Sequence, residues 1–306
     1  MSITDIIIDV IIRSLAPTDM VSIQHICEAE LDLEPDAGDL PGILRQPQGR
    51  LGLVAENGNE IAGACLGSMS RPAAGRPAGH VDLLVVDRAA AGAGTGRRLL
   101  TSMENLLRGQ GAAAVLLRGN PPGYAWPGVD VRYTAMTCLA ASAGYERYGD
   151  AVDMAVDLQT ADLGTGAAEE RLAAAGLTVR RPAAAEAAPI TDWLAAGPWG
   201  GSAWPQEAAV ALARRPPGCH VACRDSRYVG FACHGSIRRG WFGPMGTLES
   251  ERQHGIGALL LRRCLADMRA DGLQTARIGW VGPVRFYART VGARIERVYW
   301  LYRKAL

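Results

Sequence analysis

Lysine is almost absent from this chain of 306 residues: Lys304 is the only one, and arginine supplies the remaining positive charge. P-loop nucleotide-binding proteins and protein kinases hold phosphates with a lysine, and pyridoxal enzymes and class I aldolases form a Schiff base through one. A lysine at position 304 fits none of the places that these enzymes require. The composition therefore excludes all four classes.

Excess charge and long apolar runs are also lacking. Lys+Arg (32) nearly balance Asp+Glu (31), and a formal net charge of +1 argues against the broad basic surface of a non-specific nucleic-acid binder. The apolar run at 6–12 contains Asp9 and is far shorter than the roughly 20 residues that span a bilayer. Its β-branched residues predict a buried strand. We expect neither a nucleic-acid partner nor a membrane.

The cysteines favour a reducing compartment. There are seven of them, an odd number spread along a long chain with no secretory signal, which indicates reduced thiols and a cytoplasmic location. Cys219, Cys223, Cys233 and His234 lie close in the sequence, but their spacing lacks the paired C-x2-C knuckles of a structural zinc site. We expect buried cysteines there and no metal.

The glycines reveal an internal repeat. The segment GTGRRLLTSMENLLRGQG begins at Gly94 and GIGALLLRRCLADMRADG begins at Gly255, an offset of 161 residues. In each, a glycine-rich turn precedes an apolar stripe at helical spacing, and a glycine suited to a left-handed cap follows the helix. Strand-like runs flank the helices, at 80–86 and 112–118 in one copy and at 241–248 and 275–281 in the other. The chain is therefore predicted to be a tandem duplication.

The segments between these motifs suggest a domain boundary. Each half contains a further hairpin-like pair of strands, and Asn57-Gly58 is the turn signal of the first. The small and polar residues from 159 to 175 open a linker. A second matched pair, Gly144 and Gly292, is offset by 148, so the first copy carries 13 extra residues (161 minus 148), which fall around the loop at 120–130. We expect an N-terminal domain at 1–160 and a C-terminal domain at 161–306.

The strongest chemical signal is RQHGIGALLL, residues 252–261, at a predicted strand-to-helix turn. N–H groups in the first turn of a helix lack intrahelical partners and lie at the positive end of its dipole. Glycines at 255 and 257 let an anion approach these amides, so a phosphate or pyrophosphate is the natural ligand. A dinucleotide-binding turn fits poorly, because its G-x-G-x-x-G follows the first strand of a domain, whereas these turns follow about the fourth.

These residues resemble a known family. The stretch Arg252-Gln253-His254-Gly255-Ile256-Gly257 resembles the R/Q-x-x-G-x-G/A acyl-CoA pyrophosphate loop of the GNAT acyltransferases, and GPVRFYARTVGA resembles that family's next motif. The order of elements is similar in both halves, so the resemblance covers nearly the whole chain and is closest to tandem bacterial GNAT proteins. It implies an α/β (α+β) fold of two GNAT domains, each a mixed, mostly antiparallel sheet flanked by helices.

The resemblance also implies acetyl-CoA (acyl-CoA) as the cofactor and assigns residues to it. Backbone groups at the end of the strand before the loop would hold the pantetheine arm; they belong to Met245, Gly246 and Thr247. Amides of the loop would hold the pyrophosphate, and they belong to Arg252, Gln253, His254, Gly255, Ile256 and Gly257. The matching positions of the first half are Val85, Val86, Gly92, Gly94 and Gly96.

Candidate catalytic residues follow from the same resemblance. Tyr287 matches a tyrosine that commonly protonates the leaving thiolate, although it lies five residues before Gly292, one more than the commonest spacing. A tyrosine packed under the sheet is the structural alternative. Glu249 and Glu251 are candidate bases, each through water, or else solvated loop residues.

The first half departs from the family pattern. Its loop begins with Ala91 in place of Arg or Gln, and Leu139 and Ala140 stand where the tyrosine is expected. We therefore expect it to be an accessory domain that shapes the substrate cleft. Against this, His80 with Asp82 on the same strand face could accept an amine proton, unless the histidine is simply bonded to its neighbours.

Tryptophans mark the expected acceptor site of the second half. The segment at 192–205 contains Trp193, Trp199 and Trp204. In a GNAT fold this region borders the acceptor, so Trp199 and Trp204 would form an aromatic wall for an apolar or cationic substrate.

The resemblance thus implies an N-acetyltransferase that transfers an acyl group from CoA to an amine of a small molecule by direct attack. Two alternatives stay open: a non-catalytic acyl-CoA sensor or scaffold, and an acyltransferase acting on a hydroxyl or a peptide N-terminus. The acceptor, the acyl length and the oligomeric state are left open.

Overall fold

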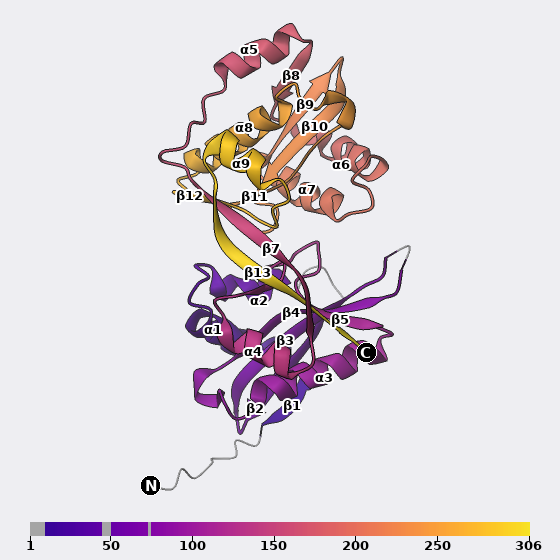
Figure 1. The fold of residues 1–306 in the computed structure, drawn as a ribbon, viewed down its shortest axis with the longest axis vertical. Helices are drawn as coiled ribbons and strands as arrows, with labels where there is room; N and C mark the ends of the chain where they lie inside the picture. Colours follow the sequence, from indigo (N-terminus) through magenta and orange to yellow (C-terminus); the bar gives the residue numbers. More distant parts are fainter. Residues whose placement is uncertain (1–9, 45–49, 73–74) are drawn as a thin grey trace. The chain divides into compact units, whose positions relative to one another are not determined.

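The computed structural model, drawn in Figure 1, describes residues 10–44, 50–72 and 75–306. It packs as two compact units. The first unit contains the residues up to Ala151 together with Tyr299–Leu306, and the second unit contains Val152–Val298. Each unit is a mixed sheet with helices on both faces, which confirms the fold class predicted from the sequence.

The first unit is built on six strands in the order β1-β2-β3-β4-β5-β13, of which only β4 and β5 run parallel to each other. A short strand β6 also pairs with β13. Before β13 its elements are β1 (Ile11–Ser14), α1 (Met20–Glu30), α2 (Leu40–Leu44), β2 (Leu51–Asn57), β3 (Glu60–Ser70), β4 (Ala78–Val86), α3 (Thr95–Gly109), β5 (Ala114–Leu117), β6 (Val129–Asp130) and α4 (Thr134–Ser142). The apolar stripe of α3 covers one face of the sheet, and α1 and α2 cover the other. Of the strand predicted near the start, residues 6–9 lie outside the described residues.

The second unit repeats this plan in the order β8-β9-β10-β11-β12-β7, with β11 and β12 as its parallel pair. After β7 its elements are α5 (Gly166–Ala174), β8 (Leu177–Arg180), α6 (Ala187–Ala196), α7 (Trp204–Ala213), β9 (Cys219–Arg224), β10 (Arg227–His234), β11 (Trp241–Thr247), α8 (Ile256–Ala270), β12 (Thr275–Ile278) and α9 (Val284–Val291). The helices α8 and α9 pack on one face, and α6 and α7 pack on the other.

Glycines close the local elements as their sequence positions predict. Gly58 turns the β2–β3 hairpin with a φ of +62°, and Gly111 and Gly272 follow α3 and α8 with φ angles of +87° and +84°. A side chain is strained in this left-handed region, so glycine is the residue that ends both helices without cost.

Two long strands exchange between the units. The strand β7 (Glu146–Asp157) follows α4 of the first unit, but its later part pairs with β12 of the second, with Met154 opposite Ile278. The strand β13 (Arg294–Ala305) follows α9 of the second unit, but its later part pairs with β5 of the first, with Tyr302 opposite Leu117. The compact units therefore differ at their ends from the chain-order segments 1–160 and 161–306.

No helix in the three described stretches has both the length and the apolarity that crossing a bilayer requires.

The exchange predicts where a change near residue 300 is felt. Tyr299 has 0% of its surface exposed and pairs with Asp130 of β6, so Tyr299→Ala removes a packed ring from the first unit. We expect a loss of about 3–5 kcal/mol in the free energy of unfolding, measured by urea denaturation. Hydrogen exchange should speed up at the amides of β5 and β6. Val298→Ala, at a position 38% exposed, is the matched control, and faster exchange confined to the second unit would contradict the assignment.

Candidate functional site

The parallel strands β11 and β12 of the second unit part soon after they meet. They pair only at Trp241 with Arg277 and at Phe242 with Ile278, whereas β11 stays paired with β10 as far as Thr247. Successive residues of a strand direct their backbone groups to alternate edges. The segment Met245–Thr247 therefore presents N–H and C=O groups on an edge that has no partner strand among the described residues.

The loop before α8 offers a row of free amides. Gln253 and Gly255 take left-handed φ angles of +74° and +86°, and α8 begins at Ile256. Among the described residues, the amides from 253 to 258 donate to no group of the chain, and the next one, of Leu259, donates to the Gly255 carbonyl at 3.2 Å. Such a concave row at the positive end of a helix dipole suits a phosphate.

The first unit repeats this backbone. Pairing of β4 with β5 ends at His80 opposite Leu116, while β4 stays paired with β3 as far as Val86. Gly92 and Gly94 have φ angles of +80° and +82°, at the positions of Gln253 and Gly255 by the offset of 161. The amides from 92 to 97 likewise have no acceptor in the described chain.

Valine side chains at the open edge of the first unit alternate between faces. Val85 packs toward α1 and α2, and Val86 packs toward α3. Gly96 lies at the start of α3, where an added Cβ would stand 3.6 Å from Val86 and 3.5 Å from Leu139. In both units, the unpaired backbone groups of the strand and the free amides of the loop therefore fit an extended chain that ends in a pyrophosphate.

The side chains around the loop before α8 differ in whether hydrogen bonds hold them in place. Glu251 is fixed, because both of its carboxylate oxygens accept hydrogen bonds from Arg224, at 2.8 and 2.9 Å, and these bonds lower its pKa. Glu249 is 91% exposed and lies 3.9 Å from the Arg252 guanidinium, which is also exposed. His254 is held to the loop by a 3.2 Å contact between Nδ1 and the Glu251 carbonyl.

Tyr287 of α9 is linked to the loop before α8 by Phe286, which packs against it. Its ring meets Phe286 and Phe242 edge-on, with centroids 5.1 and 6.2 Å apart, and an added Cβ at Gly257 would stand 3.6 Å from the Phe286 ring. The side chain is 7% exposed, and burial raises the pKa of Tyr287 to about 12. Its hydroxyl bonds to no other described residue. It therefore keeps its proton at neutral pH and has it free to donate.

In the described part of the first unit, the equivalent positions carry no hydroxyl. Leu139 stands beside Gly96 where Phe286 stands beside Gly257, and Ala140 is fully buried in the core. Neither side chain has an acidic group that could donate a proton to a leaving thiolate.

His80 and Asp82 of β4 are engaged in a buried polar network. The Nε2 atom of His80 lies 2.9 Å from the Ser70 hydroxyl, and burial, with the nearby Arg118 and Arg50, lowers its pKa to about 3. Asp82 lies 2.9 Å from the Arg50 guanidinium and accepts a 3.0 Å hydrogen bond from the Asn120 amide. Burial nevertheless raises its pKa to about 6. The histidine is therefore neutral, and its Nε2 is already in use.

An aromatic cluster stands over β11 on the face covered by α6 and α7. Trp199 packs against Phe231 and Trp204 at centroid distances of 5.2 and 6.4 Å, and against Trp193 at 5.3 Å. A Cβ added at Gly246 would lie 2.5 Å from the Trp199 ring. The absence of a side chain at Gly246 thus lets an indole lie directly on the strand whose edge is open.

Glu207 of α7 is a further candidate, which its place in the sequence did not suggest. Its side chain is 5% exposed, and burial raises its pKa to about 7. The available signal was a glutamate within the apolar stripe of a helix, between Trp204 and Ala208.

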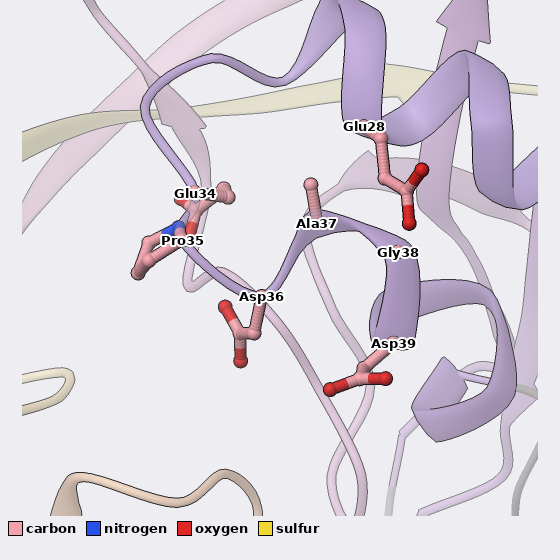
Figure 2. Close-up of a pocket in the computed structure, with 7 residues that line it drawn as sticks. All are labelled: Glu28, Glu34, Pro35, Asp36, Ala37, Gly38 and Asp39. Carbon is pink, nitrogen blue, oxygen red and sulfur yellow. The ribbon is translucent and has the colours of Figure 1, made fainter.

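An acidic pocket of the first unit was also missed (Figure 2). It has a volume of about 240 Å³, lies where α1 leads into α2, and is lined by Glu28, Glu34, Pro35, Asp36, Ala37, Gly38 and Asp39. Glu34 is buried and accepts a 2.9 Å hydrogen bond from the Trp126 indole. The crowding of carboxylates at 28–39 was the signal in the sequence.

The cysteines singled out earlier lie in the core of the second unit. Cys219 and Cys233 face each other across β9 and β10, and Cys223 is buried on the same strand face. Within the described ranges, no three His, Cys, Asp or Glu side chains are placed to hold a metal ion.

Comparison with known proteins gives a family match and several similar folds. The model of the acetyltransferase (GNAT) family matches residues 17–125 and 188–293. A GCN5-related glucosamine N-acetyltransferase region of a fungal multi-domain GH3 β-N-acetylglucosaminidase has a TM-score of 0.79 at 16% identity, covering 96% of this chain and 38% of that one. This chain thus spans well under half of that protein.

Two further solved structures match over most of both chains. A tandem GNAT protein from the clavulanic acid biosynthesis pathway has a TM-score of 0.67 at 18% identity, covering 97% of this chain and 98% of that one. A GCN5-related N-acetyltransferase from Sphaerobacter thermophilus has a TM-score of 0.65 at 18% identity, covering 97% and 95%. No curated protein matches in sequence. At such identities the structural likeness shows the fold.

The contact between Trp199 and Gly246 can be tested by substitution. Gly246→Ala would place a methyl group 2.5 Å from the indole, so we expect the ring to shift and the free energy of unfolding to fall by about 1–3 kcal/mol. The double variant Gly246→Ala/Trp199→Ala should lose less than the sum of its single changes. Gly257→Ala is the control, because its methyl group would meet nothing closer than 3.5 Å. Additive losses in urea denaturation would show that the two residues do not touch.

Proposed function

Because the chain belongs to the acetyltransferase (GNAT) family, we propose that its second unit transfers the acetyl group of acetyl-CoA to an amine of a small molecule. One observation carries this proposal. Among the described residues, only the second unit combines an open strand edge and a row of free amides with a protonated hydroxyl, that of Tyr287, whose ring packs on the Phe286 ring beside Gly257.

The chain holds the donor mainly through its backbone. Met245, Gly246 and Thr247 bond the pantetheine arm along the open edge of β11, as an added strand would. Amides from Gln253 to Gly257 hold the pyrophosphate at the start of α8. The Arg252 amide, assigned to this role from the sequence, is not among them because it donates to the Glu249 carbonyl at 3.2 Å, but the exposed Arg252 guanidinium adds a positive charge. Acetyl-CoA bound in this way supplies an acetyl group activated as a thioester.

Catalysis then needs positioning and two proton movements. Tyr287 donates its proton to the sulfur that leaves, a role supported by its raised pKa of about 12 and its unbonded hydroxyl. Glu249 passes the proton lost by the amine to bulk water, since it is 91% exposed beside the loop. Trp199 and Trp204 form the wall against which the acceptor lies.

The first unit is proposed to bind acyl-CoA without transferring its acyl group. Val85 and Val86 lie on an open edge like that of β11, and Gly92, Gly94 and Gly96 shape an equivalent row of amides. Leu139 offers no proton for a leaving thiolate. We further propose a cytoplasmic location, which the seven free cysteines support.

The role of Tyr287 predicts the effect of removing one oxygen atom. Tyr287→Phe keeps the ring packing, so we expect the affinity for CoA to stay and the turnover number to fall by about 100-fold or more. The measurement is thiol release from acetyl-CoA with a panel of amines. Tyr228→Phe, which removes a hydroxyl bonded to Glu186 at 2.8 Å, is the control. If no amine supports thiol release by the wild type, the chain is an acyl-CoA sensor; an unimpaired Tyr287→Phe would remove the tyrosine from the mechanism.

The division of labour between the units predicts unequal effects of matched substitutions. Gly257 and Gly96 are equivalent by the offset of 161, and an added Cβ would stand 3.5 Å from the nearest atom at both. A tryptophan at either position fills the space in front of the amides. We expect Gly257→Trp to abolish turnover and Gly96→Trp to leave it unchanged while removing one CoA site in calorimetry. Loss of turnover in Gly96→Trp alone would place the chemistry in the first unit.

A further inference from the structure

Glu207 is a buried carboxylate whose side chain has no partner among the described residues. It shares the inward face of α7 with Pro205, Ala208, Ala211 and Leu212, which are all buried at helical spacing. Its side chain is 5% exposed, yet it forms no hydrogen bond or ion pair with any other described residue. Burying an unpaired carboxylate costs free energy that the packing of α7 does not explain.

The position of Glu207 relates it to the open edge of β11. It lies one helical turn after Trp204, which contacts Phe231 and stacks on Trp199 at centroid distances of 6.2 and 6.4 Å. Trp199 in turn lies on Gly246. The carboxylate therefore belongs to the same aromatic-lined face of the sheet as the strand segment proposed to hold the thioester arm.

No cation of the described chain neutralises it. Cys233 of β10 is a titratable group whose pKa the Glu207 carboxylate affects. Burial raises the pKa of the Cys233 thiol well above its usual value, so the thiol is uncharged at neutral pH. His220 of β9 and His234 of β10 face the other side of the sheet, where they lie 2.7 and 3.4 Å from the Asp267 carboxylate of α8. On α6, Asp192 is exposed to solvent.

We propose that Glu207 binds the acceptor as a cationic amine and takes its proton, so that the acceptor site of the second unit selects an ammonium group next to an apolar or aromatic wall. The faces of Trp199 and Trp204 attract such a cation. Glu207, which no cation of the described chain neutralises, gives it a negative partner. This inference rests on the function proposed above. It makes Glu207 the group at the reacting nitrogen, with Glu249 further out toward solvent.

The proton movements balance. The bound ammonium gives one proton to Glu207, and the nitrogen lone pair then attacks the thioester carbonyl carbon. The nitrogen–carbon bond forms, the carbon–sulfur bond breaks, and Tyr287 gives its proton to the sulfur. A second proton from the nitrogen restores Tyr287 through solvent, and Glu207 releases its own proton to solvent. A burial-raised pKa of about 7 suits both the uptake and the release.

The first test needs no turnover. Tetramethylammonium, which cannot be acetylated, should change the tryptophan fluorescence of the wild type, and Glu207→Gln should weaken its binding by at least about tenfold. Uncharged tert-butanol is the matched probe, and it should bind both proteins equally weakly. Glu170→Gln, at an exposed position of α5, is the control variant. Equal binding of tetramethylammonium to wild type and Glu207→Gln would overturn the proposal.

The second test is the pH profile. In the wild type, kcat/KM for an amine should rise with pH through about 7 as Glu207 ionises. Glu207→Gln should lose this limb and at least about 100-fold in kcat/KM while keeping its affinity for CoA, and Glu207→Asp should restore the limb in part. A limb that persists in Glu207→Gln, or that disappears in Glu249→Gln instead, would overturn the assignment.

Stability provides a readout independent of both. The folded pKa of Glu207 lies above the ordinary value of 4.5, so the protonated form favours folding and this contribution is lost as the pH rises through about 7. The urea midpoint of the wild type should fall relative to Glu207→Gln as the pH rises from about 4.5 to about 7, and an unchanged difference between the two proteins would refute the buried titration. If the wild type binds tetramethylammonium through Glu207 but acetylates no amine, the proposed function fails and the cation site stands.

Discussion

The site depends on one constraint: a strand that leaves its neighbour must find other partners for its backbone groups. In the second unit, β11 and β12 share only two residue pairs, and the backbone groups left over on β11 face an open edge. The loop before α8 adds amides that the helix cannot use. Hydrogen-bonding groups that the fold does not use are thus concentrated at one end of the sheet, and through them a chain with a single lysine would hold the pyrophosphate of the proposed cofactor.

The two units show which parts of such a site are set by the backbone and which by side chains. Gln253 and Gly255 in one unit and Gly92 and Gly94 in the other take the same left-handed conformations, although one of the four is not glycine. The surroundings have diverged: a leucine lines one loop and an aromatic pair lines the other, and a buried polar network occupies β4 where an aromatic cluster covers β11. The two units thus share the backbone conformation of the loop and differ in the side chains around it.

Much of this could be predicted because it is local. Glycines that need a left-handed φ, apolar stripes of 3.6-residue period and the offset between Gly94 and Gly255 all leave a mark within a few residues, and they gave the repeat, the helices and the loops. The exchange of β7 and β13 could not be read in this way, because strand pairing between distant residues has no local signature. Glu207 could not be found for another reason. In the sequence it only interrupts the apolar face of a helix, and its lack of a partner among the described residues appears only in three dimensions.

The exchanged strands also bear on how the chain is made. During synthesis the first unit emerges with its sheet unfinished, since the outer edge of β5 is covered only by the part of β13 that begins at Tyr299. The ribosome must therefore synthesise the second unit, roughly half of the chain, before that edge is paired. An uncovered strand edge is a template for pairing with another molecule. The nascent first unit therefore carries an unpaired edge on β5 until β13 is made, and transiently unpaired strand edges make folding intermediates prone to aggregation.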